Sequence, residues 1–272
     1  MELLEMFSWP FMQRALIAGV LVSLCAALLG VSLVLKRYSM IGDGLSHVSF
    51  GALAVAVALG ITPLYFSIPV VILSAFFLLR LATSGSRMGN DAAIAVISAS
   101  ALAIGVLVIS LTTGMTTDVD NYMFGSVLAM TETDVLLSAA VSAAVLALFV
   151  LFYHKLFAIT FDENFARATG MRVELYNTLL SILTALTIVL GMRMMGAMLI
   201  SSLVIFPALT AMRLFRSFRG VVLCAGATAV LCFGAGLIIS FAESTPVGAT
   251  VVVADLVLFL LACVIQWLRK KT

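Results

Sequence analysis

Charged side chains are scarce in this sequence. Only 10% of the 272 residues are Asp, Glu, Lys or Arg, whereas 63% are hydrophobic and the mean hydropathy is +1.23. A soluble domain is roughly one quarter charged, because its surface must face water. The shortage of charge therefore excludes a water-soluble globular protein and predicts a chain whose outer surface faces lipid.

Cysteine motifs and nucleotide-binding motifs are missing as well. The four cysteines stand apart in apolar runs without a C-x-x-C pair, so they predict neither a disulfide framework nor a structural zinc site. No G-x-x-x-x-G-K-[ST] motif is present, and the chain therefore lacks a P-loop with which to hydrolyse ATP. The formal net charge of +2 points to no particular partner, and we expect no nucleic acid to bind.

Nine apolar runs are candidates for membrane-spanning helices. A run of about 20 residues matches the thickness of the bilayer hydrocarbon, and a helix pairs its backbone polar groups within one segment. The sequence thus predicts an all-α integral membrane protein, a polytopic bundle of about nine transmembrane helices that forms a single domain over residues 1–272. The runs are 11–35, 45–60, 64–82, 92–114, 134–157, 175–192, 194–212, 220–242 and 247–268.

The distribution of Lys and Arg predicts the orientation of these spans. With the N-terminus outside, thirteen of the 15 basic residues face the cytoplasm, and only Arg14 and Arg193 face outward. Cytoplasmic loops are enriched in basic residues, so we expect the N-terminus outside and the C-terminus in the cytoplasm. The outer loop after the fourth run is acidic, and its semi-apolar stretch 122–128 could form a short re-entrant helix.

The cytoplasmic loop after the fifth run has the pattern of a short helix. Thr160 followed by Glu163 fits a capping box, and Gly170 suits the residue after a helix end. We expect a helix over 161–169 with Phe161 and Phe165 on one face. Two such aromatic side chains would either dock another protein or fold back onto the membrane surface, and the sequence leaves both open.

Asp43 and His47 are the most informative polar pair. They lie one helical turn apart, and a carboxylate with an imidazole suits a divalent transition metal. Nearby Gly42, Gly44 and Gly51 are expected to loosen or break the helix, as in discontinuous membrane helices. The alternative is a capping Asp and a hydrogen-bonded His, but ionisable groups in the apolar zone are expensive and usually line a pathway.

The pair supplies too few ligands for a stable metal site. Structural zinc sites use four ligands, whereas a transported ion must bind and leave again. Two copies of the chain facing each other would offer two Asp43 and two His47 side chains. We therefore expect a homodimer with the ion path at or near the seam.

Two further features lie in later spans. Asp255 is an intramembrane carboxylate, which either pairs with a serine or threonine of a neighbouring helix or faces the path; the structural interpretation is slightly favoured. Pro207 is expected to kink or open the seventh span. Small residues that permit close helix contact precede it, namely Gly191, Gly196, Ala197, Ser201 and Ser202.

Taken together, these motifs resemble a known family. Nearly end to end, the chain is similar to the membrane permease of bacterial ATP-binding-cassette importers for zinc and manganese. The segments that carry this resemblance are Pro10–Leu16, Leu35–Arg37, Gly42–His47, Phe124–Ala129, Thr160–Glu163 through Gly170–Met171, Gly196–Ser202 with Pro207–Ala208, and Thr245–Pro246.

The resemblance implies a function and a set of partners. It implies a homodimeric permease in the bacterial cytoplasmic (inner) membrane, two cytoplasmic ATPase subunits that use the ATP, and an extracytoplasmic metal-binding protein. No cofactor would be bound permanently; zinc would be the transported ion, with manganese next and iron third. Asp43 and His47 match metal-contact positions, whereas Asp255 matches no position associated with the family. The ATPase-coupling element would comprise Phe161, Asp162, Glu163, Phe165 and Gly170.

Two other functions fit parts of the sequence. A stand-alone ion-coupled secondary transporter could use Asp43, His47 and Asp255 as proton or cation relays, but no inverted repeat is visible. An intramembrane enzyme could use Asp43 and His47 as acid and base, but the sequence offers no accompanying nucleophile or third metal ligand.

Overall fold

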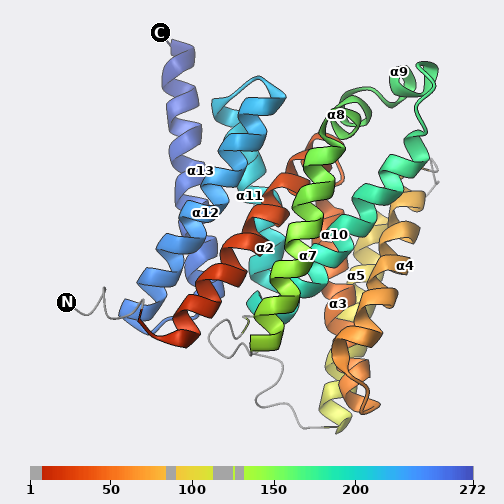
Figure 1. The fold of residues 1–272 in the computed structure, drawn as a ribbon, viewed down its shortest axis with the longest axis vertical. Coiled ribbons are helices and arrows are strands. Elements are labelled where there is room, and N and C mark those ends of the chain that lie inside the picture. The colour runs from red at the N-terminus through yellow and green to blue at the C-terminus, as the bar shows by residue number, and fades with distance from the viewer. Residues whose placement is uncertain (1–7, 84–89, 113–124, 126–131, 272) are drawn as a thin grey trace.

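The computed structural model describes residues 8–83, 90–112, 125 and 132–271, and its elements over these ranges are all helices. In chain order they are α2 (Pro10–Leu35), α3 (Ser39–Ala58), α4 (Pro63–Thr83), α5 (Asn90–Thr112), α7 (Glu132–Leu151), α8 (Tyr153–Phe161), α9 (Glu163–Ala168), α10 (Val173–Met195), α11 (Ala197–Leu214), α12 (Phe218–Glu243) and α13 (Val247–Lys271). Figure 1 shows them as one elongated bundle.

The prediction of an all-α membrane bundle is confirmed. Within the described ranges, eight helices are long and apolar enough to cross a bilayer: α2, α3, α5, α7, α10, α11, α12 and α13. Helix α4 adds a shorter apolar helix, Leu64–Arg80. The nine-span topology and its orientation stay predictions that agree with this arrangement.

The inner helices of the bundle are α2, α3 and α10, and α11 lies among them. Helix α2 packs against α7, α10, α11 and α12, while α3 packs mainly against α4 and α5. Lipid tails give no hydrophobic drive between such helices, so close packing at small residues stabilises the contact. Gly30 illustrates this, because a Cβ there would lie 2.0 Å from the carbonyl oxygen of Val204 on α11.

Helix α3 differs from the expectation of a broken second span. It begins at Ser39 rather than near residue 45 and is continuous to Ala58. Its glycines provide room for neighbours instead of loosening the helix: Gly42 faces the Val204 side chain, and a Cβ at Gly51 would lie 2.6 Å from the Ala101 carbonyl oxygen. Tight packing on these bare positions keeps the helix intact.

The interruption near the seventh span lies at Gly196. Of the two effects predicted for Pro207, an opening of the helix is not found, and a kink stays a prediction. Helix α11 is assigned without a gap from Ala197 to Leu214, with Pro207 buried inside it. Gly196 separates α10 from α11 with φ +85°, a conformation that favours glycine. Gly125 lies against this junction, since a Cβ there would be 2.6 Å from the Gly196 nitrogen. The rest of the predicted 122–128 helix is outside the described residues.

The element that the sequence predicts to be cytoplasmic is two short helices instead of one helix over 161–169. Helix α8 ends at Phe161, Asp162 is extended, and α9 covers Glu163–Ala168. The N-cap is Asp162, whose carboxylate accepts a hydrogen bond from the Phe165 N–H at 2.9 Å. The predicted capping box is therefore wrong: Thr160 belongs to α8 and donates to the Leu156 carbonyl at 2.6 Å.

The end of α9 agrees with the sequence. Gly170 has φ +82°. Its N–H donates to the Arg167 carbonyl at 3.1 Å, and the Met171 N–H donates to the Ala166 carbonyl at 3.1 Å. This pair of bonds is a Schellman motif, in which a left-handed glycine ends the helix. The prediction that Gly170 follows the helix end is confirmed.

The two basic residues that the predicted topology places outside are both ion-paired. Arg14 pairs with Glu132, and Arg193 pairs with Asp134 at 2.9 Å. Both acids belong to the first turn of α7. In Figure 1 the helices α8 and α9 and the C-terminus lie at the opposite end of the bundle. An end whose bases are neutralised is compatible with the outer side under the positive-inside rule.

The close approach at Gly30 predicts a specific loss of stability. Gly30→Ala should lower the free energy of unfolding by about 1–3 kcal/mol, because the new methyl group forces α2 away from α11. Gly234→Ala is the matched control, since no atom lies within 4 Å of a Cβ at that helical glycine. Thermal unfolding in detergent measures both variants. Equal midpoints for the two variants would contradict the packing explanation.

Candidate metal site and cytoplasmic helix pair

Asp43 and His47 lie on one face of α3. The Asp43 Oδ2 and His47 Nε2 atoms are 3.6 Å apart, at the i,i+4 spacing of a single helical turn. The Asp43 side chain is 38% exposed and that of His47 is 25% exposed. The two groups are therefore neither enclosed in the core nor fully covered by other parts of the chain.

Hydrogen bonds hold this part of α3 against α11. The Ser46 hydroxyl donates to the Asp43 backbone carbonyl at 2.7 Å and lies 2.9 Å from the Ser201 hydroxyl. Ser201 in turn donates to the Ala197 carbonyl at 2.8 Å. The candidate site thus sits where α3 meets the first turn of α11, immediately after the interruption at Gly196.

One stripe along the N-terminal part of α3 is left uncovered. It consists of Met40, Asp43 and His47, while Gly42, Gly44, Leu45, Ser46 and Val48 around it are buried. The Nδ1 atom of His47 is itself buried and has no hydrogen-bond partner among the described residues. The other ring nitrogen of His47, Nε2, and the carboxylate oxygens of Asp43 can both act as ligands to a cation.

A single copy of the chain supplies only a partial site. No group of three or more His, Cys, Asp or Glu side chains that could hold a metal ion occurs in the described ranges. A two-ligand set leaves a divalent transition metal with vacant coordination positions. Further donors would have to come from water, from backbone groups or from a second chain.

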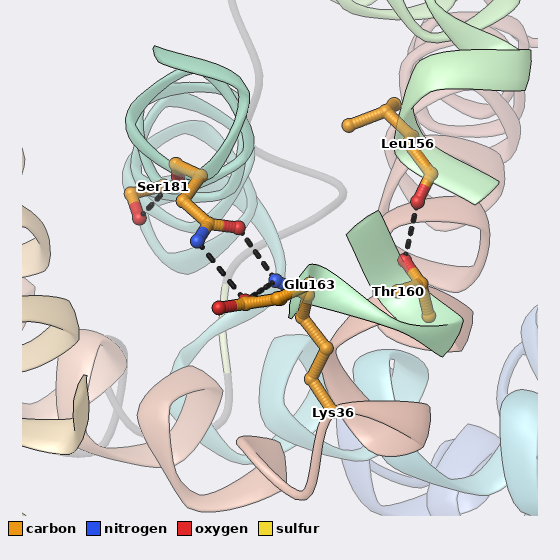
Figure 2. Close-up of polar contacts among 6 residues, drawn as sticks. Lys36, Leu156, Thr160, Glu163 and Ser181 are labelled. Atoms are coloured by element: carbon orange, nitrogen blue, oxygen red, sulfur yellow. Dashed lines mark hydrogen bonds and ion pairs between the residues drawn. The ribbon is translucent and has the colours of Figure 1, made fainter. Parts of the chain in front are cut away.

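A second polar cluster joins α9 to the rest of the protein. The Lys36 Nζ atom, at the C-terminus of α2, lies 2.5 Å from Oε1 of Glu163, the first residue of α9. Lys36 also donates to the Asn177 side-chain carbonyl at 2.5 Å, and the Asn177 amide donates to Glu163 at 3.1 Å. Figure 2 shows Lys36 and Glu163 pointing toward one another. The three side chains close a network between α2, α9 and α10.

Burial sets the electrostatics of this network. The Lys36 side chain is only 4% exposed and that of Glu163 is 33% exposed. Burial lowers the pKa of Lys36, although the nearby Glu163 carboxylate opposes this effect. Burial also raises the pKa of Glu163, but Lys36, Asn177 and Arg167 outweigh it and hold that pKa below its usual value. These pKa shifts show that each side chain stabilises the charged form of the other against the effect of burial.

No local motif indicates the contact made by Lys36. In the sequence it is a base next to Arg37, whereas its acidic partner is 127 residues away. Glu163 matches a capping-box pattern that the structure does not contain. The actual contact depends on the packing of α9 against the end of α2, which a local motif does not encode.

Phe161 and Phe165 are both exposed, but they do not share a helix face. Phe161 ends α8 and packs near the rings of Phe157 and Phe218, with centroid distances of 4.9 and 5.9 Å. Phe165 belongs to α9 and is 65% exposed. The extended conformation of Asp162 separates the two helices, so the predicted arrangement on one helix face is wrong. Docking to a protein and folding back onto the membrane surface both stay open.

Asp255 lies away from the Asp43–His47 pair. It is completely buried in α13, whose main packing partners are α11 and α12. Neither carboxylate oxygen has a hydrogen-bond partner in the described part of the chain, and the polar neighbour is Cys232 of α12. The expected pairing with a serine or threonine is not found, and the structure does not join Asp255 to the candidate metal site.

Comparison with known proteins gives consistent matches over almost the whole chain. The sequence model of a family described as the ABC 3 transport family matches residues 8–266. The high-affinity zinc uptake system membrane protein ZnuB of Haemophilus influenzae is 33% identical over 248 residues, which cover 91% of this chain and 95% of that protein. The manganese import system permease protein ScaB of Streptococcus gordonii is 29% identical over 265 residues, with coverages of 96% and 95%.

A solved structure supports the same grouping. The structure of PsaBC from Streptococcus pneumoniae in complex with Fab contains a chain that matches with a TM-score of 0.86 and 29% sequence identity. The match covers 96% of this chain and 94% of that chain. The helix arrangement in Figure 1 is therefore one that a related membrane protein also adopts.

The network around Lys36 predicts an asymmetric response to mutation. Glu163→Ala leaves a buried ammonium without its partner and should destabilise the protein by about 3–5 kcal/mol. Lys36→Met should cost less, because Glu163 remains partly in water and the methionine fills the apolar space. Thermal unfolding of both single variants and the double variant in detergent completes a double-mutant cycle. The cycle measures the coupling free energy between Lys36 and Glu163. Equal losses in the two single variants would show that the pair is not buried as described.

Proposed function

The chain belongs to the ABC 3 transport family, and from this premise we propose that it is the permease subunit of an ATP-driven importer that carries a divalent transition metal into the cytoplasm. Residues 1–272 would act as a single transmembrane permease domain. The chain lacks a P-loop, so ATP hydrolysis is assigned to a separate subunit. The protein is a multi-pass membrane protein, and its proposed location is the bacterial cytoplasmic (inner) membrane.

The observation that carries this proposal is the uncovered Asp43–His47 pair. Ionisable side chains that face lipid at membrane depth are unfavourable by several kcal/mol, and they normally line a polar path. A carboxylate and an imidazole at this spacing are good transition-metal ligands. The most economical arrangement therefore has this stripe of α3 facing a conduit and not the lipid.

A second copy of the chain would complete the site. Helix α11 carries a partly exposed stripe next to Ser46, formed by Met198, Ser201, Ile205, Leu209 and Met212. If this stripe and the uncovered face of α3 pack against their counterparts, two Asp43 and two His47 side chains converge. Such a set of four ligands suits an ion that is bound for a short time during transport.

Zinc is the proposed ion, followed by manganese and then iron. Imidazole and carboxylate donors bind each of these ions, so the ligand types alone do not select one. The relatives are named for both zinc and manganese. The ion is cargo in this proposal, and no permanently bound cofactor is needed.

The helix pair α8–α9 is the proposed contact with the ATPase. Phe161, Asp162 and Phe165 present an exposed surface on it, and Glu163 connects this surface to Lys36. Lys36 precedes Asp43 by seven residues, at the corner between α2 and α3. A displacement of α9 by the ATPase would thus reach the metal-site helix through the ion pair. Two ATPase subunits and an extracytoplasmic metal-binding protein complete the proposed assembly.

Loss of either candidate ligand should abolish transport. We expect Asp43→Ala and His47→Ala to reduce metal uptake to background in proteoliposomes that contain the ATPase and the binding protein, because each removes half of the ligands. ATPase co-purification should persist in both variants. Ser202→Ala is the control and should retain uptake, since Ser202 is buried in α11 and its hydroxyl donates to the Leu199 carbonyl of the same helix at 2.8 Å. Uptake driven by a proton gradient without the ATPase would instead support the secondary-transporter alternative.

The ATPase contact has its own test. Phe165→Asp should release the ATPase, because a charged group replaces an exposed apolar one at the proposed interface, while the folded membrane domain is unaffected. Tyr65→Asp is the matched control, since Tyr65 is also exposed but belongs to the first turn of α4. Co-purification of tagged ATPase, together with size-exclusion profiles, reports both effects. An undiminished yield of ATPase with Phe165→Asp would reject this assignment.

A further inference from the structure

A groove of about 540 Å³ lies between α2, α7 and α12, on the side where α8 begins. Its walls are apolar along most of their length, with Leu24 and Leu28 from α2, Val150 from α7 and Leu223 from α12. Val150 and Leu223 are strongly exposed. Neither α7 nor α12 contributes to the α3–α11 face at which the second copy is proposed to bind.

The groove is polar at one end only. Tyr153 and His154, from the first turn of α8, and Arg219, from the first turn of α12, lie there. Arg219 and His154 are exposed, and Arg219 forms no ion pair with any other described residue. The N-terminus of the 26-residue helix α12 adds partial positive charge at the same place.

Aromatic side chains gather beside this end of the groove. The ring of Phe218, the first residue of α12, lies 5.4 Å from Tyr153 and 5.1 Å from Phe157. Tyrosine is enriched where the hydrocarbon region meets the headgroups, and the position of Tyr153 is compatible with such an interface. The same end of the bundle carries α8, α9 and the C-terminus (Figure 1), which the charge distribution assigns to the cytoplasm.

We propose that this groove binds an anionic phospholipid of the cytoplasmic leaflet. The phosphate lies against Arg219, His154 and the Tyr153 hydroxyl, and an acyl chain lies along Leu24, Leu28 and Leu223. A cationic rim above an apolar wall complements a molecule with a negative head and an apolar tail. Basic pockets between transmembrane helices on the cytoplasmic side recognise anionic headgroups in this way.

Charge complementarity selects the anionic lipid over other occupants. The ammonium group of a zwitterionic lipid would bring a positive charge toward Arg219 and offset part of the attraction of its phosphate. A second copy of the chain would bring its own basic cytoplasmic end to the same rim. Like charges at close range are unfavourable, so neither occupant fits the rim as well as phosphatidylglycerol.

The lipid selectivity can be measured on the full chain in detergent. Phosphatidylglycerol and phosphatidylcholine with identical acyl chains are added separately, and native mass spectrometry counts the retained lipids. The unmodified chain should retain phosphatidylglycerol preferentially. Arg219→Gln should weaken phosphatidylglycerol binding about fivefold, which is the loss expected for one basic group near a charged headgroup. Phosphatidylcholine binding should not weaken. Arg172→Gln removes an exposed cation outside the groove and should leave the retention of both lipids unchanged.

A second variant tests the apolar part of the groove. Ala227 also lines it, and Ala227→Trp should fill the acyl-chain space and reduce retention of both lipids, while the size-exclusion profile stays the same. Equal retention of the two lipids by the unmodified chain, or insensitivity of phosphatidylglycerol binding to Arg219→Gln, would overturn the proposal. A change of oligomeric state in Ala227→Trp would show that a second copy occupies the groove and would also overturn it.

Discussion

The ion pair between Lys36 and Glu163 is the interaction on which the arrangement of α2, α9 and α10 at one end of the bundle depends. Helix α9 has only six residues, which is too short to be stable by itself. Its first residue is fixed by a buried ammonium at the end of α2 and by Asn177 of α10. Ala166 of α9 is also completely buried in the hydrophobic core. The ion pair and this apolar contact together attach the short helix to the corner between α2 and α3.

That corner links two regions that are far apart in the sequence, the proposed metal site and the proposed ATPase contact. The α2–α3 connection runs from Lys36 to Ser39, and Asp43 follows within the first turns of α3. A force applied at the exposed Phe165 therefore has a short mechanical route to the proposed ligands. The contact between Ser46 and Ser201 extends this route to α11, which borders the open side of the site.

The two intramembrane carboxylates show how context decides the role of a charged residue. Asp43 has His47 one turn away and remains accessible. Asp255 is enclosed between helices with Cys232 as its polar neighbour. Asp43 thus has a candidate co-ligand and a partly exposed side chain, as the proposed cation exchange requires, whereas Asp255 is buried. The sequence already separates the two residues in part, since Asp43 has His47 one helical turn away and Asp255 has no such partner inside its apolar run.

Composition and periodicity were sufficient to predict the membrane bundle and the extents of most helices, because the bilayer imposes apolar runs of defined length. The Asp43–His47 pair was also evident, since its spacing is local to one helix. Only the tertiary structure shows that neighbouring helices pack closely against the glycines of α3. It likewise shows that the helix is interrupted at Gly196 and not at Pro207. The pairing of Glu163 with Lys36, in place of a capping box, is also decided there. These outcomes depend on contacts between segments distant in sequence, whose geometry is fixed only when the helices pack.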